Sequence, residues 1–195
     1  MTTVGLLLAA GRSRRFGPED KLLAGFAGAP LVSHAARALA GCGFDHLLAA
    51  VCSARVAALL AEYECVRLDA TAAAQSDSLR AGVSRAAELG ADRLVIVLGD
   101  MPNLTSHLIR RVADTCGAGL ASAATDGTCP MPPACFPSGS FAALSALSGD
   151  RGAGSLLRDL PAGQLVRATA NDLLDFDTPE ALARAEANAA RRRNP

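Results

Sequence analysis

The chain begins with an apolar segment that ends abruptly at a basic loop. Residues 4–9 are continuously apolar, and Gly11 follows them almost at once. Three arginines and a serine come next, and Lys21 closes the loop. A short apolar run bounded by a turn predicts a strand buried in a parallel sheet. A glycine-bounded cationic loop after such a strand suits a polyphosphate, because backbone N–H groups can approach the anion while the cations neutralise it.

Segments of strand type and helix type alternate along most of the chain. This alternation predicts an α/β protein: a three-layer, Rossmann-like sandwich with a mostly parallel central sheet. The proline-rich residues 126–137 break the pattern, and we expect a surface excursion there. The predicted strands cover residues 4–9, 44–51, 63–68, 93–98, 120–124, 164–168 and 173–176, and the predicted helices cover residues 30–41, 54–61, 76–89, 106–116, 141–147, 153–160 and 179–190.

Composition excludes several classes of protein. The formal net charge is zero, whereas a general nucleic-acid binder is normally basic. Six cysteines occur without a CxxC pair or a histidine cluster, which argues against a zinc site and favours buried thiols in a reducing cytoplasm. No apolar stretch is long enough to cross a membrane, and no cleavable leader is evident. We therefore expect a cytoplasmic protein without nucleic-acid or membrane partners.

Acidic residues follow two of the predicted strands. Asp100 comes directly after residues 93–98 and Gly99, at the carboxyl edge where ligands bind in parallel sheets. It is typical of a carboxylate that holds Mg²⁺ beside phosphate oxygens, although a turn aspartate fits equally well. Asp175 and Asp177 would share one face of a strand. One of them is expected to be functional and the other to cap the last helix, with the choice open.

Two further segments have both a functional and a plain structural interpretation. Ser76, Asp77 and Ser78 begin a predicted helix, so they would either contact a base or phosphate or simply cap the helix. The glycine-rich residues 149–154 would either border an acceptor pocket or form a tight connection. The first loop fits neither of the commonest nucleotide motifs, since Gly17 is followed by Pro18 and no GxGxxG is present.

Five segments, in order along the chain, together resemble the molybdopterin nucleotidyltransferases, and most closely the molybdenum cofactor cytidylyltransferase type. Phe16, Ala74, Met131 and Ala181 depart from the family pattern, which bears on substrate specificity more than on the reaction. The matching segments are LAAGRSRRFGPEDK at 8–21, SDSLRAG at 76–82, LGDMP at 98–102, the prolines 132–133 with GDRGA at 149–153, and DFDTPE at 175–180.

The resemblance implies a nucleotide-diphospho-sugar transferase fold and transfer of CMP from CTP to the phosphate of molybdopterin, with Mg²⁺ and loss of pyrophosphate. One domain over residues 1–190 is expected, with a nucleotide-binding half at 1–103, an acceptor-binding half at 104–190 and a tail at 191–195. The implied site residues are Arg15, Lys21 and Asp100 for catalysis; Leu8, Ala9, Ala10, Gly11, Arg15, Lys21, Ser76, Ser78 and Gly99 for the nucleotide; and Asp100, Asp175 and Asp177 for the metal.

The same resemblance favours CTP over GTP. Cytidine-using relatives carry Ala-Ala-Gly where guanosine-using ones carry Ala-Gly-Gly, and a side chain at Ala10 would narrow the base pocket. Three alternatives stay open: GTP as the donor, a sugar or polyol phosphate such as methylerythritol phosphate as the acceptor, and a maturation factor that binds the nucleotide without turnover. A molybdenum enzyme or a maturation factor is the expected protein partner.

Overall fold

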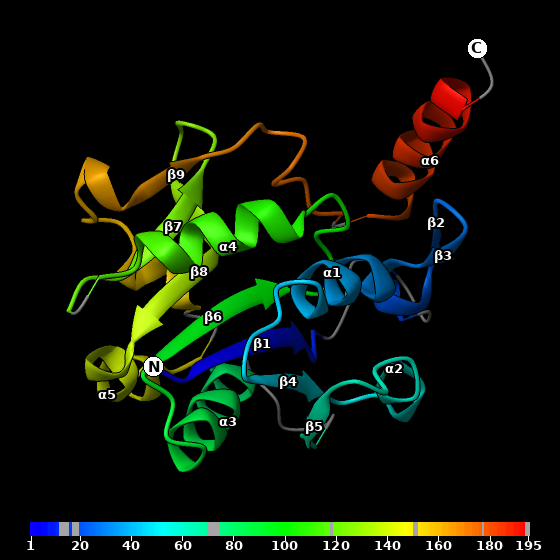
Figure 1. Cartoon of the computed structure of the whole chain (residues 1–195). Helices are drawn as coiled ribbons and strands as arrows, with labels where there is room; N and C mark the ends of the chain where they lie inside the picture. The colour runs from blue at the N-terminus through cyan, green and yellow to red at the C-terminus, as the bar shows by residue number, and fades with distance from the viewer. Residues whose placement is uncertain are drawn as a thin grey trace.

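A seven-stranded sheet in the order β5-β4-β1-β6-β8-β7-β9 forms the centre of the computed structural model (Figure 1). The structure describes residues 1–11, 16, 20–69, 75–117, 119–149, 152–176 and 178–193. β1, β4, β5 and β6 are parallel, and β8 runs antiparallel to both of its neighbours. The strands are β1 (Thr3–Ala9), β4 (His46–Val51), β5 (Glu64–Arg67), β6 (Arg93–Leu98), β7 (Ser122–Thr125), β8 (Pro130–Pro137) and β9 (Leu165–Arg167).

Helices cover both faces of this sheet, so the predicted three-layer α/β architecture is confirmed (Figure 1). The helices are α1 (Leu31–Ala40), α2 (Ala54–Ala57), α3 (Gln75–Glu88), α4 (Ser106–Thr115), α5 (Phe141–Ser145) and α6 (Pro179–Arg193). The shorter elements are the hairpin of β2 (Gly25–Phe26) with β3 (Ala29–Pro30) and the 3-10 turns η2 (Lys21–Leu23), η3 (Ser138–Ser140), η4 (Ala153–Leu156) and η5 (Ala162–Gln164).

The core divides into two clusters because successive strand residues point to opposite faces. Leu7 belongs to the cluster under α1 and α4, and Leu6 belongs to the one under α3 and α5. Gly82 brings α3 close to β1, since a Cβ atom there would lie 2.4 Å from Cδ2 of Leu6. The helix therefore packs on the strand at the distance that only a glycine permits.

The register of β1 determines where the chemistry can lie. Leu8 pairs with Ala50 of β4 on one side and with Leu98 of β6 on the other, so these parallel strands end at the same level. The residues that follow them, Gly11 and Asp100 among them, lie at the carboxyl edge of the sheet. The sequence predicted this edge correctly.

The prediction of a surface excursion at residues 126–137 was wrong. Residues 130–137 form β8, and Ala134, Cys135 and Phe136 are at most 1% exposed. The pairing of β8 with β6 runs from Pro137 to Ala134 and stops before Pro132 and Pro133. Prolines lack the N–H that a sheet ladder needs, and these two lie where β8 no longer pairs with β6.

Three other predictions need correction. The segment 153–160 forms only η4 and a turn, and residues 173–176 are irregular rather than a strand. Asp175 consequently lies on no strand face, and Asp177, the other predicted carboxylate, lies outside the described residues. α6 continues to Arg193, so residues 191–193 of the expected tail are helical.

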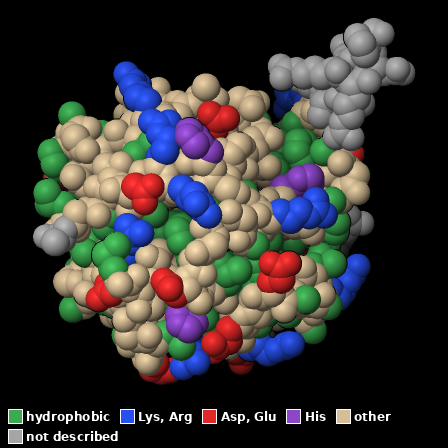
Figure 2. Space-filling model, in the orientation of Figure 1, with side chains coloured by type: hydrophobic (Ala, Val, Ile, Leu, Met, Phe, Trp, Pro, Cys, Tyr) green, Lys and Arg blue, Asp and Glu red, His purple; other side chains and the backbone are tan. Residues whose placement is uncertain are grey.

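All six cysteines are free thiols, but only Cys42 and Cys135 are buried. Burial raises the pKa of Cys42 to about 11. Acidic and basic side chains are interspersed over the face of the molecule shown in Figure 2, in keeping with the balanced sequence charge. None of the helices in the described part of the chain combines the length and the apolar character that a membrane crossing requires.

Candidate active site

An ion pair joins the first loop to the end of β6. Nζ of Lys21 lies 2.7 Å from Oδ2 of Asp100, although the two residues are 79 positions apart in the sequence. The two side chains are 12% and 20% exposed, so the pair is partly shielded from water and still open to a ligand. The structure thus brings together two of the three residues predicted to be catalytic. Arg15, the third, lies outside the described residues.

Local structure holds each member of this pair in place. Asp20 caps η2 by accepting a hydrogen bond of 3.0 Å from the backbone N–H of Leu22, and the buried Leu22 side chain anchors the turn in the core. Asp100 follows β6 directly, and the N–H of Gly99 donates to the carbonyl of Leu8 at 3.0 Å. The ammonium group therefore projects from the anchored turn η2, and the carboxylate group projects from the end of β6.

The two glycines of the site differ in what their surroundings require. A Cβ atom on Gly99 would lie 3.3 Å from the carbonyl oxygen of Leu8 and 3.4 Å from the side chains of Leu22 and Val32. A Cβ atom on Gly11 would meet nothing within 4 Å in the described part of the chain. Close packing explains Gly99, whereas the space beside Gly11 is open to a ligand.

The residues before Gly11 line the end of β1. Ala9 and Ala10 are 3% and 6% exposed, and the thiol of Cys52 donates to the carbonyl of Ala10 at 3.7 Å. Ala10 is therefore buried just after β1, and its carbonyl contacts the residue that follows β4. Leu8, also predicted to contact the nucleotide, lines the cavity described below.

The start of α3 is more buried than the sequence indicated. Ser76 and Ser78 are 1% and 6% exposed, and the N–H of Ser76 donates to the carbonyl of Gly149 at 3.2 Å. Asp77 forms an ion pair with Arg80 on the same helix. The amide of Ser76 is thus already used within the protein, and it ties α3 to the glycine-rich segment.

The acidic residues do not assemble a complete metal site by themselves. No group of three or more His, Cys, Asp or Glu side chains that could hold a metal occurs among the described residues. Asp175 is exposed and lies in the irregular segment before α6, next to the buried Phe176. Asp100 lies just after the end of β6, at the carboxyl edge of the sheet.

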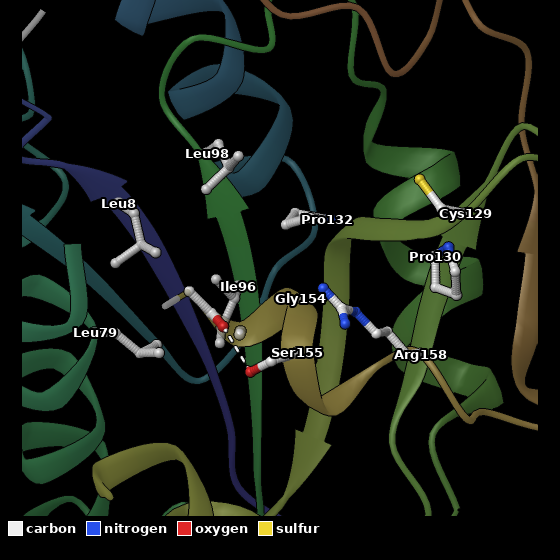
Figure 3. A pocket seen from close by; sticks show the side chains of 12 residues that line it. Leu8, Leu79, Ile96, Leu98, Cys129, Pro130, Pro132, Gly154, Ser155 and Arg158 are labelled. Carbon is white, nitrogen blue, oxygen red and sulfur yellow. Dashed lines mark hydrogen bonds between the residues drawn. The ribbon is translucent and has the colours of Figure 1, made fainter. Parts of the chain in front are cut away.

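A cavity of about 540 Å³ lies beside the ends of β1 and β6. Figure 3 shows Leu8 and Leu79 on one side of it and Pro130, Cys129 and Arg158 on the other. The hydroxyl of Ser155 donates to the carbonyl of Gly152 at 3.2 Å. The lining residues are Leu8, Leu79, Ile96, Leu98, Cys129, Pro130, Pro132, Gly152, Ala153, Gly154, Ser155 and Arg158.

Sequence reasoning singled out part of this lining. The glycine-rich segment was singled out, and Gly152 and Gly154 do border the cavity. Arg158 and Cys129 carried no motif, and their position depends on β8, which the sequence did not predict. In the sequence alone, a basic residue shortly after a glycine-rich segment does not indicate a binding site. The fold is needed to show that Arg158 lines the cavity.

Comparison with known proteins agrees with this geometry. Residues 5–167 match the MobA-like NTP transferase domain family. The chain is 31% identical over 192 residues to the purine catabolism protein PucB of Bacillus subtilis strain 168, covering 91% of this chain and 92% of that protein.

Solved structures share the same fold. Rv0371c of Mycobacterium tuberculosis H37Rv is 25% identical with a TM-score of 0.82 and covers 96% of this chain and 99% of its own. A complex of Rv0371c with manganese is 24% identical, with a TM-score of 0.79 and the same coverage. The 4-diphosphocytidyl-2C-methyl-D-erythritol synthase of Anaerococcus prevotii is 13% identical with a TM-score of 0.75, covering 97% and 98% of the two chains.

These likenesses confirm the nucleotide-diphospho-sugar transferase type of fold. The family match spans most of the chain, and the Bacillus relative covers nearly all of it. The chain belongs to the MobA-like NTP transferase domain family and is a nucleotidyltransferase.

Proposed function

We propose that this nucleotidyltransferase transfers CMP from CTP to the phosphate of molybdopterin and releases pyrophosphate. The observation that carries the proposal is the ion pair between Lys21 and Asp100, because it places a cation and a carboxylate together at the carboxyl edge of the sheet. Transfer of a nucleotidyl group depends on positioning and charge neutralisation, and both groups serve these ends.

In this proposal Lys21 binds the triphosphate and stabilises the negative charge that develops on the departing pyrophosphate. Arg15 shares this task, and we propose no role for Arg12 and Arg14. The open space beside Gly11 allows its backbone to approach the phosphates. The acceptor is already an ionised phosphate, so no general base is required.

The carboxylate of Asp100 fits a Mg²⁺ ion that is completed by substrate oxygens. Mg²⁺ is usually held by one or two carboxylates together with phosphate oxygens, so Asp100 and one further carboxylate would be sufficient protein ligands. When bound, the ion would neutralise the phosphates at the reacting phosphorus. We propose Asp175 or Asp177 as the second carboxylate.

We propose CTP as the donor because Ala10, buried just after β1, carries a methyl group. A methyl group at this position leaves less room for a purine than a glycine would. We further propose that residues 1–103 bind the nucleotide and that residues 104–190 bind the acceptor. A cytoplasmic location is proposed as well, because the six free thiols suit a reducing compartment.

The acceptor is the least constrained part of this proposal. The Bacillus relative is 31% identical and is named for purine catabolism, whereas the Anaerococcus enzyme, named for methylerythritol, is 13% identical. That enzyme shares the fold at only 13% identity, so its acceptor does not extend to this chain.

Pyrophosphate release from purified protein tests the proposal. We expect release with CTP, Mg²⁺ and molybdopterin, and little with GTP or with methylerythritol phosphate. Release that is faster with GTP would overturn the choice of base. Nucleotide binding without release with any acceptor would instead support a maturation factor.

A further inference from the structure

The turn between β7 and β8, residues 126–129, forms part of the cavity rim. Cys129 ends this turn and Pro130 begins β8, and both line the cavity (Figure 3). We propose that Arg167 of β9 is a positioning residue, which holds this turn in place and thereby raises the affinity for the acceptor. The inference rests on the proposed function in one respect, because it takes residues 104–190 as the acceptor-binding half.

The sheet itself holds the tip of this hairpin only loosely. The pairing of β8 with β6 stops at Ala134. Beyond that residue the register with β7 shifts, and the tip continues with two pairs, the last of which joins Thr125 to Pro130. A proline has no N–H to donate to such a ladder. The turn therefore depends for its position on contacts outside the ladder.

Arg167 supplies such a contact from the neighbouring strand. β9 runs parallel to β7, and Arg167 pairs with Thr125 at the base of the turn. Its Nη1 donates to the carbonyl of Asp126 at 3.1 Å. A Cβ atom on Gly127 would lie 2.2 Å from the same Nη1 and 3.3 Å from Cζ, so the guanidinium lies directly against this glycine. The guanidinium thus covers the turn and holds it by a charge-assisted hydrogen bond.

Hydrogen bonds inside the turn connect this contact to the cavity rim. The N–H of Gly127 donates to Oγ1 of Thr125 at 3.0 Å, and the N–H of Thr128 donates to Oδ1 of Asp126 at 2.8 Å. Thr125 is 6% exposed, so the base of the turn is anchored in the protein. Because Asp126 and Cys129 belong to one short hydrogen-bonded unit, loss of the contact at Asp126 should displace the rim as well.

Hydrogen exchange of the peptide that contains the turn measures how firmly the turn is held. We expect its amides to exchange about fivefold faster in Arg167→Ala, the effect of one hydrogen bond on an opening equilibrium. Gly127→Ala should act in the same direction, because its methyl group would displace the guanidinium. Arg167→Lys should restore part of the protection, since an ammonium can still donate to Asp126.

Steady-state kinetics separates positioning from a purely structural role. In Arg167→Ala the KM for molybdopterin should rise about fivefold, in line with the loss of one hydrogen bond, while kcat and the KM for CTP stay unchanged. Arg111→Ala is the matched control, because this exposed arginine of α4 contacts the backbone of Arg167 rather than the turn. It should behave like wild type in both measurements.

Three results would overturn the inference: unchanged hydrogen exchange in Arg167→Ala, an unchanged KM for molybdopterin, or an equal rise in the KM for CTP. If the wild type released no pyrophosphate with molybdopterin, the proposed function would be wrong. Hydrogen exchange would then decide by itself whether Arg167 holds the turn.

Discussion

The two halves of the chain are built differently. In residues 1–103, β1, β4 and β6 are parallel strands of six or seven residues whose ends coincide. In residues 104–190, β7 and β9 are short, β8 is antiparallel, and the 3-10 turns η3, η4 and η5 lie between α4 and α6. The Lys21–Asp100 pair belongs to the regular half, whereas most of the cavity lining comes from the irregular half. We infer that the reaction depends on the first half and the choice of acceptor on the second.

The largest expected effect is at the ion pair. We predict that Asp100→Asn and Lys21→Ala each lower kcat/KM by about 10²–10³-fold, the usual cost of removing one charge-stabilising group. The loss should be the same for every acceptor, which steady-state pyrophosphate release will measure. Asp159→Asn, an exposed change in the second half, is the control. If kcat/KM fell for one acceptor only, the first half would also take part in the choice of acceptor, and the proposed division of roles would be wrong.

The next effect separates two glycines of the first half. Gly82→Val should destabilise the protein by about 1–3 kcal/mol through overpacking against Leu6. Gly11→Ala should change stability by less than about 0.5 kcal/mol, since no described atom lies near its Cβ position, yet weaken nucleotide binding. Urea unfolding and CTP titration measure the two quantities. Equal destabilisation by both changes would show that Gly11 serves packing.

A smaller effect concerns the choice of nucleotide. Removing the methyl group in Ala10→Gly should raise the ratio of kcat/KM for GTP to that for CTP about tenfold, roughly the discrimination that one methyl-sized contact supplies. Competition between the two nucleotides in one reaction gives the ratio directly. An unchanged ratio would place base selection outside the end of β1.

The smallest effect is on acid stability. The backbone N–H of Thr3 donates to Oδ2 of Asp45 at 2.7 Å and holds the pKa of that carboxyl below its usual value. A lowered folded pKa adds stability that is present above the unfolded pKa and is lost as the pH falls through the folded one. Asp45→Asn should therefore reduce the difference in melting temperature between pH 7 and pH 3. Asp159→Asn should leave that difference unchanged.

The elements of residues 1–103 were easier to predict from the sequence than those of residues 104–190. The apolar run Arg93–Leu98 was predicted with the bounds that β6 has, because a buried parallel strand has a simple signature. β8 was missed because Pro130, Pro132 and Pro133 read as a loop. Their missing N–H groups are tolerated where the strand stops pairing with β6, and that pairing depends on contacts remote in sequence.

The candidate site was predictable in part for the same reason. Gly11 and Asp100 each follow a recognisable strand, so both were expected at the carboxyl edge. That Lys21 reaches Asp100 depends on β1 and β6 being neighbours, which no local pattern encodes. The position of Arg158 at the cavity could not be predicted from the sequence, because β6, β8 and η4 together enclose that cavity.

The ion pair between Lys21 and Asp100 also has a consequence for the order of binding. Each group already neutralises the other, since Nζ of Lys21 lies 2.7 Å from Oδ2 of Asp100. A triphosphate that arrives alone must draw the ammonium away from the carboxylate, and a divalent cation that arrives alone must compete with the ammonium. When the two arrive as one complex, the ammonium of Lys21 pairs with the phosphates while the carboxylate of Asp100 pairs with the cation. The metal and the nucleotide should therefore bind synergistically, each raising the affinity for the other.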